Sequence, residues 1–104
     1  MRMSIRSAAV LAAGSLALLT GGTALAYTGQ DLAPQAKVSL SKARAVALKA
    51  RPGKITDQEL EKEAGGTGLR YSFDIKAHKV TYEVGVDART GKVLENAKEG
   101  LHPD

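Results

Sequence analysis

Two stretches in the second half of the chain alternate between apolar and polar residues, as strands with one buried face do. Their apolar positions are Leu69, Tyr71, Phe73 and Ile75 in the first stretch and Val80, Tyr82, Val84 and Val86 in the second. An antiparallel hairpin places all eight side chains on one face, whereas a shift of one residue would scatter them over both. Burial therefore favours this assignment of faces.

The register of the hairpin depends on the turn between the two stretches. If Lys76 lies opposite Lys79, then Ala77 and His78 form a two-residue turn. Because Ala-His is not the Asn-Gly type that such a turn prefers, a four-residue loop over residues 76–79 remains open. In both cases the opposed pairs are Ile75 with Val80, Phe73 with Tyr82, Tyr71 with Val84, and Leu69 with Val86.

Residues 38–52 have the spacing of an amphipathic helix, with apolar positions three and four residues apart. Ser39 is the predicted N-cap, and Arg51-Pro52-Gly53 ends the helix. The apolar stripe consists of Leu40, Ala43, Val46, Ala47 and Ala50. We interpret Lys42, Arg44 and Lys49 as a solvated basic face rather than a surface for an acidic partner or for lipid headgroups. A helix of this length is marginal alone, so we expect it to pack on the sheet.

Residues 54–63, KITDQELEKE, predict a polar edge strand. Leu60 should face the core opposite Tyr71, which puts Glu61 opposite Arg70 in an exposed pair of little energetic value. The Gly-rich residues 64–68 then form a hairpin loop.

DARTGK, residues 87–92, is the clearest turn sequence in the chain, because Asp opens it and Gly91 suits a position with φ > 0. With Asp87 opposite Lys92, Val86 meets Val93. Leu94 is then expected beside Gly85 on the face away from the core, as a small apolar spot where a partner can rest.

These elements predict an α+β domain over residues 38–97. One N-terminal helix packs on a three- to four-stranded antiparallel sheet, in the order α-β-β-β-β. We interpret residues 27–37 as a flexible arm and residues 98–104 as a polar tail.

Residues 1–26 predict a cleaved signal peptide. Arg2 and Arg6 precede an uncharged apolar run, and Thr-Ala-Leu-Ala precedes the expected cleavage after Ala26. The alternative, an uncleaved membrane anchor, is disfavoured because Gly and Thr residues interrupt the run. Cleavage of 26 of the 104 residues leaves 78 and lowers the net charge from +4 to +2, since both arginines are lost. We expect a periplasmic or secreted protein that does not bind nucleic acid.

No catalytic constellation is present in the sequence. His78 and His102 are the only imidazoles, the serines lack a His-and-carboxylate pattern, and no Gly-rich loop precedes a helix. We expect no catalytic residue and no cofactor.

Alternating acidic residues suggest a second class of function, cation binding. The candidate ligands are Asp57, Glu59, Glu61, Asp74 and Glu83. Same-face residues on one strand are about 7 Å apart, so the row on residues 54–63 does not converge on one ion. A charged edge that resists strand-to-strand aggregation is the favoured interpretation.

The order of these features resembles a PepSY domain. The resemblance covers about residues 37–97 and rests on VSLSKARAVALKARPG, on the strand with Tyr71 and most specifically on VDARTGKVL. It implies an extracytoplasmic module, a helix on an antiparallel sheet, found in propeptides of thermolysin-like metalloproteases and as small exported proteins. This sequence contains no attached protease, so an inhibitory role is an extension of the resemblance.

We therefore expect a non-enzymatic exported binding module that regulates or inhibits a protease or another envelope protein. A cation-binding or envelope-sensing protein is the alternative. The expected partner is an exported protein such as a metalloprotease, met by strand addition along residues 55–63 or on the outer sheet face at Arg70, Ser72, Glu83 and Leu94. The protein should be a monomer or a weak edge-strand dimer, without stable membrane insertion after cleavage.

Overall fold

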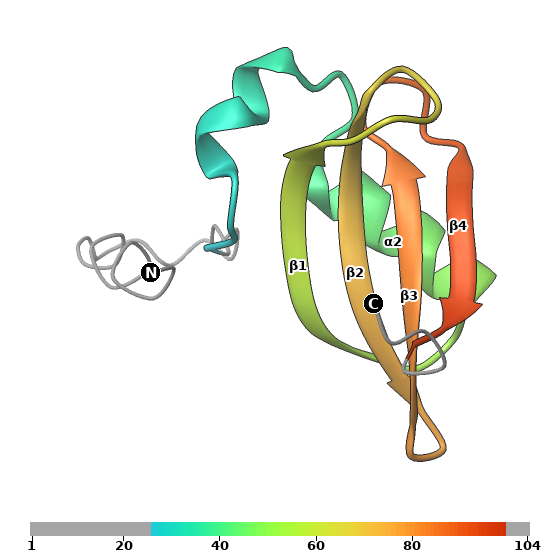
Figure 1. Cartoon of the computed structure of the whole chain (residues 1–104). Coiled ribbons are helices and arrows are strands. Elements are labelled where there is room, and N and C mark those ends of the chain that lie inside the picture. The colour runs from blue at the N-terminus through green and yellow to red at the C-terminus, as the bar shows by residue number, and fades with distance from the viewer. Residues whose placement is uncertain (1–25, 100–104) are drawn as a thin grey trace, which may run out of the picture.

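The computed structural model describes residues 26–99. It contains the 3-10 helix η2 (Gln30–Gln35), the helix α2 (Leu40–Ala50) and the strands β1 (Lys54–Lys62), β2 (Leu69–Ala77), β3 (Val80–Asp87) and β4 (Val93–Lys98). The four strands form one antiparallel sheet in the order β1-β2-β3-β4 (Figure 1). The predicted α+β arrangement is therefore confirmed.

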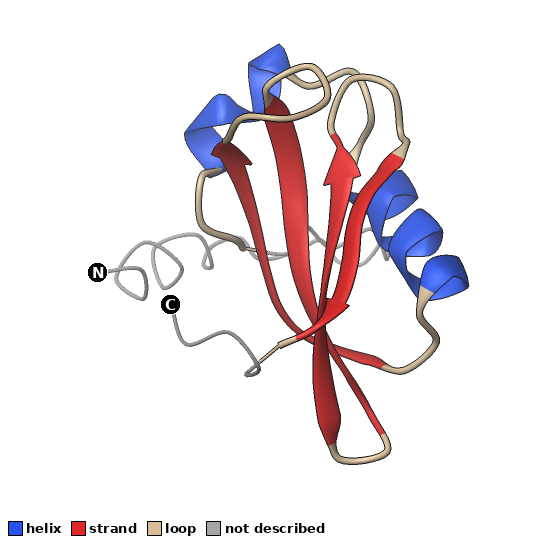
Figure 2. Cartoon of the chain, turned by 45° about the vertical axis from the view of Figure 1, so that its right-hand side comes forward, coloured by secondary structure: helices blue, strands red, loops and turns tan. Residues whose placement is uncertain are grey.

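The sheet has two different faces (Figure 2). The inner face is the one covered by α2, and the outer face carries no helix. The inner face holds the core, whose buried sheet residues are Leu60, Leu69, Tyr71, Phe73, Ile75, Val84 and Val86. Val80 and Tyr82, nearer the β2–β3 turn, are only half-buried. The predicted assignment of faces is confirmed.

Helix α2 begins and ends where the sequence predicts. The Ser39 hydroxyl accepts a hydrogen bond from the Lys42 N–H at 3.1 Å, and the helix ends one residue before the Arg51-Pro52 pair. Ala43 and Ala47 are fully buried against the sheet. Their small side chains allow the helix to lie close to the large residues of β2.

The register of the β2–β3 hairpin differs from the prediction by two residues. Tyr71 faces Val86, Phe73 faces Val84, Ile75 faces Tyr82, and Ala77 faces Val80. The predicted partners of all four pairs are therefore wrong, although every side chain keeps its face. A shift of two residues preserves the alternation, so the hydrophobic pattern cannot detect it.

The turn explains this register. His78 and Lys79 form the two-residue connection, with φ of 53° and 69°. Two positive φ values are typical of the type I′ turn, whose twist matches that of the flanking strands. Neither the Ala77-His78 turn nor the loop over residues 76–79 is present.

Strand β1 has the predicted register with β2. Leu60 faces Tyr71 and Glu61 faces Arg70, while a bulge interrupts the pairing between Ile55 and Asp57. Because the bulge adds one residue, Ile55 and Leu60 both face inward although they are an odd number of residues apart.

The β3–β4 turn also forms as predicted. The Asp87 N–H donates to the Lys92 carbonyl at 2.8 Å, and the Gly91 N–H donates to the Asp87 carbonyl at 2.9 Å. Gly91 has φ of 82°, which an L side chain rarely adopts. Val86 faces Val93, as expected.

A second bulge follows in β4 and overturns the expected position of Leu94. After the Val86–Val93 pair, Gly85 faces Glu95, so Leu94 is the extra residue of the bulge. Its side chain lies against Gly66 of the β1–β2 loop. The expected apolar spot of Leu94 over Gly85 therefore does not form.

Asp87 is the most strongly bound carboxylate of the domain. Its side chain is 1% exposed and accepts from the backbone N–H groups of Thr67 (2.7 Å), Arg89 (2.8 Å) and Thr90 (3.0 Å), and from the Thr67 hydroxyl (2.9 Å). Burial alone would raise the pKa of Asp87, but these four donors outweigh it and lower the pKa to about 2.

The segment before α2 lies along β1. The Leu60 N–H donates to the Thr28 carbonyl at 2.8 Å, and the side chains of Tyr27 and Leu32 pack against the core. None of the described helices is long and apolar enough to cross a membrane. The division into leader, arm, domain and tail stays a prediction, since residues 1–25 and 100–104 lie outside the described residues.

We predict that Asp87→Asn lowers the free energy of unfolding by about 3 kcal/mol, because the amide replaces one acceptor oxygen by a donor facing N–H groups. The folded pKa of Asp87 is lower than its ordinary value of 3.8. Its stabilisation is therefore present above about pH 4 and is lost as the pH falls towards 2. Urea unfolding at several pH values measures both effects. Asp57→Asn, at an exposed carboxylate, is the control, and equal stability of the two variants would contradict the prediction.

We also predict that Lys79→Gly raises the free energy of unfolding by about 1 kcal/mol, because glycine adopts positive φ without the cost that an L side chain incurs. The control is Lys76→Gly in β2, where glycine should instead destabilise the strand. Thermal unfolding compares the two, and a loss of stability in Lys79→Gly would show that the turn is not strained.

Candidate functional site

The outer face of the sheet gathers most of the predicted site residues. Alternation along the paired strands directs six carboxylates to this face, from Asp57, Glu59, Glu61, Asp74, Glu83 and Glu95. The cations on the same face of the described sheet are Lys54, Arg70 and Lys76. The outer face is therefore acidic, and no helix covers it (Figure 2).

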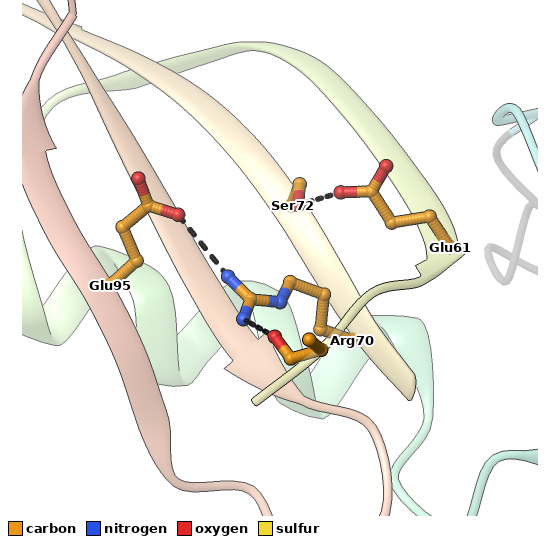
Figure 3. A network of polar contacts seen from close by, with 5 residues as sticks. Glu61, Arg70, Ser72 and Glu95 are labelled. Carbon is orange, nitrogen blue, oxygen red and sulfur yellow. Dashed lines mark hydrogen bonds and ion pairs between the residues drawn. The ribbon is translucent and has the colours of Figure 1, made fainter. Parts of the chain in front are cut away.

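Arg70 lies at the centre of a polar network on this face (Figure 3). It is only 6% exposed, and its Nη1 forms an ion pair with Glu95 Oε1 at 3.2 Å while Nη2 donates to the Ala64 carbonyl at 3.1 Å. Glu61 lies opposite Arg70 on the neighbouring strand, as predicted. The prediction of an exposed pair between them is wrong, because Arg70 is buried and its ion-pair partner is Glu95.

Gly85 makes the burial of Arg70 possible. A Cβ atom at residue 85 would lie 2.9 Å from Arg70 Nη1, so only glycine leaves room for the guanidinium over β3. The β4 bulge then places Glu95 opposite Gly85, within reach of the cation. A glycine inside a strand was the sequence feature that could have indicated this close approach.

Ser72 and Glu61 form the second half of the network. The Ser72 hydroxyl donates to Glu61 Oε2 at 2.7 Å, and Ser72 is 6% exposed (Figure 3). Burial raises the pKa of Glu61, and the nearby carboxylates of Glu59 and Glu63 raise it further, while the Ser72 hydrogen bond lowers it. The Ser72 hydroxyl is thus engaged in holding the Glu61 carboxylate and is not free to bind a partner.

Three carboxylates converge further along the outer face. Oxygen atoms of Asp74, Glu83 and Glu99 lie within 4.8 Å of one another. Burial raises the pKa of Glu83 to about 7, with added repulsion from Glu95, Asp74, Glu99 and Glu61. Burial also raises the pKa of Asp74, with added repulsion from Glu99, Asp57 and Glu59.

The cation-binding hypothesis is only partly reflected in this geometry. Asp74 and Glu83 come together as two of its five candidate ligands, but the third carboxylate of the group is Glu99 rather than Asp57, Glu59 or Glu61. Sequence reasoning missed Glu99 because it was assigned to the polar tail. Acidic groups also crowd on sheets that bind no ion, so cation binding stays a prediction.

A groove of about 400 Å³ lies at the free edge of β1, where sequence reasoning expected only strand pairing. Its walls come from β1, α2 and the segment before η2, and its lining residues are Ala26, Tyr27, Thr28, Arg44, Ile55, Thr56, Asp57 and Gln58. The guanidinium of Arg44 donates to the side-chain oxygen of Gln58.

No histidine of the described residues lies on the outer sheet face or in the groove. His78 is exposed in the β2–β3 turn, and His102 lies outside the described residues.

Comparison with known proteins gives one match. The family model for PepSY, described as "Peptidase propeptide and YPEB domain", matches residues 37–96. That range extends from the residues before α2 into β4, so it includes the core, the Asp87 turn and the Arg70 network. Neither the curated proteins nor the solved structures gave a match.

We predict that stability falls as the pH rises from about 5 to about 8. The folded pKa of Glu83, about 7, is higher than its ordinary value of 4.5. The stabilisation linked to its proton is therefore complete below about pH 4.5 and is lost as the pH rises through 7.

Thermal unfolding across this range tests the prediction. Glu83→Gln is neutral at every pH and should flatten the decline, whereas Asp31→Asn, at an exposed carboxylate of η2, should leave it unchanged. An unchanged decline in Glu83→Gln would show that this carboxylate is not its source.

Proposed function

The chain belongs to the PepSY family, and from this we propose that it is a non-enzymatic, exported binding module that regulates or inhibits a protease or another envelope protein. The match over residues 37–96 carries the proposal, because the family is described as a peptidase propeptide domain. Such domains are generally regulatory rather than catalytic, and they are usually extracellular or periplasmic.

The predicted signal peptide, residues 1–26, supports export. The exported protein should begin at Tyr27, the first residue after the predicted cleavage site. Mass spectrometry of protein recovered outside the cytoplasm determines this N-terminus.

The outer sheet face is the proposed contact surface. Glu83 lies in its acidic centre, while Arg70 and Ser72 hold the carboxylates of Glu95 and Glu61 in place. Leu94 lies at the end of this surface, beside the β1–β2 loop. Burial and then repulsion from nearby carboxylates raise the pKa of Glu83, and a basic group on the partner would relieve the repulsion. The partner surface is therefore expected to be basic.

We predict that the exported protein lowers the peptidase activity of a secreted thermolysin-like metalloprotease when titrated to stoichiometric excess. Glu83→Lys should weaken inhibition about tenfold, because it replaces an attractive charge by a repulsive one. Lys42→Glu, on the exposed side of α2, should inhibit like the parent protein.

Initial rates on a peptide substrate measure inhibition, and mass spectrometry confirms that the module is not digested. Flat activity curves across a panel of secreted metalloproteases would reject the inhibitory role.

The alternative, cation binding, is distinguished by titration calorimetry. Divalent and trivalent metals should give no heat and no gain in thermal stability if the protein acts only by binding proteins. Saturable heat that disappears in Glu83→Gln would favour the alternative.

A further inference from the structure

Strand β1 already accepts one extended segment at its free edge. Thr28 forms a parallel bridge with Glu59, and the Leu60 N–H donates to the Thr28 carbonyl at 2.8 Å. Figure 1 shows this segment and η2 beside β1, on the side away from β2. The edge therefore has the geometry for strand pairing, and the chain itself uses part of it.

The rest of this edge is open. Backbone N–H groups of a strand point alternately to its two sides, so the Gln58 N–H points the same way as that of Leu60, away from β2. No other described strand lies on this side of β1. The groove of about 400 Å³ lies along it, next to residues 55–58.

The two rims of the groove carry opposite charges. Arg44 lies on the α2 side, and among residues 26–99 the single ion pair, Arg70–Glu95, does not involve it. Asp57 lies on the outer side. Successive side chains of a strand point to opposite faces, so a strand in this groove would meet the two rims alternately.

We infer that residues 55–58 of β1 bind an extended segment of a partner polypeptide as an added strand, with an acidic side chain beside Arg44 and a neutral or basic neighbour beside Asp57. This inference rests on the proposed function only in naming the regulated protein as the source of that segment.

The other sheet edge is less suited to this role. Strand β4 has six residues and carries its bulge at Leu94, near its start. The Asn96 side chain is also tied to the end of α2, where it accepts from Arg51 Nε at 3.1 Å and donates to the Ala50 carbonyl at 3.3 Å. Residues 55–58 of β1 also contain a bulge, so the short length of β4 and its tie to α2 are what make that edge less suited to strand addition.

Titration of the ¹⁵N-labelled exported protein with two peptides tests the inference by NMR. The probe is acetyl-Val-Lys-Glu-Lys-Val-amide, and its comparison peptide has Gln in place of Glu. The Glu peptide should shift the amide signals of residues 55–58 and bind about tenfold more tightly. Non-specific attraction to the acidic outer face predicts the opposite order, because the Gln peptide is more positive.

Two variants locate the contact. Gln58→Pro removes the outward N–H and should weaken binding of the Glu peptide at least tenfold, while an edge strand tolerates proline where its N–H faces outward. Gln58→Ala keeps the N–H but, like the proline variant, lacks the side-chain oxygen that accepts from Arg44, so it is the matched reference, and Gln58→Pro should bind the Glu peptide at least tenfold more weakly than Gln58→Ala does. Arg44→Gln should abolish the preference for Glu over Gln, which gives an answer even if the proline variant does not fold.

Three outcomes would overturn the inference: equal affinity for the two peptides, tighter binding of the Gln peptide, or shifts confined to the outer face. Protease inhibition that Gln58→Pro leaves unchanged would overturn the regulated protease as the source of the segment, while the proposed function stands. A Glu-selective groove in a protein that affects no protease would support the inference while the inhibitory role fails.

Discussion

The hydrogen bonds of the Asp87 carboxylate hold together the end of the domain at which α2 begins. It joins the β1–β2 loop, through Thr67, to the β3–β4 turn, through Arg89 and Thr90. The next residue, Ala88, accepts backbone hydrogen bonds from Lys37 and Val38, both at 2.9 Å. One buried charge therefore fixes two loops and, through its neighbour, the point where the chain enters α2. In a chain without cysteine, this network does work that disulfides often do in small exported domains.

The sequence predicted what depends on period and on local turn chemistry. The faces of β2 and β3, the Ser39 cap and the Asp87–Lys92 turn all belong to this class. The register of the β2–β3 hairpin could not be predicted in this way, because a shift of two residues leaves every side chain on its face. The Arg70 network required two further facts, the β4 bulge and the space over Gly85. The residues of β4 that follow Leu94 are mostly polar, so no apolar alternation indicates this bulge.

The two sides of the domain differ in charge because helix α2 covers one face of the sheet and leaves the other uncovered. Helix α2 contributes Lys42, Arg44 and Lys49 on its side, whereas the uncovered outer face carries carboxylates from all four strands. The largest cation on that face, Arg70, is buried and engaged with Glu95. The remaining carboxylates repel one another, which is part of the reason that Glu83 has a pKa of about 7. The charge of the outer face therefore changes within the physiological pH range.

A domain of one helix and one four-stranded sheet has two free strand edges, and each edge is a hazard as well as an opportunity. The bond between Leu60 and Thr28 closes one end of the β1 edge, so a second copy of the chain cannot pair along the whole strand. The stretch that remains, residues 55–58, is too short for extensive pairing, and the charges of Arg44 and Asp57 at its rims restrict which segment can enter. The same arm thus limits aggregation along β1 and leaves a short site for strand addition that selects its partner by charge.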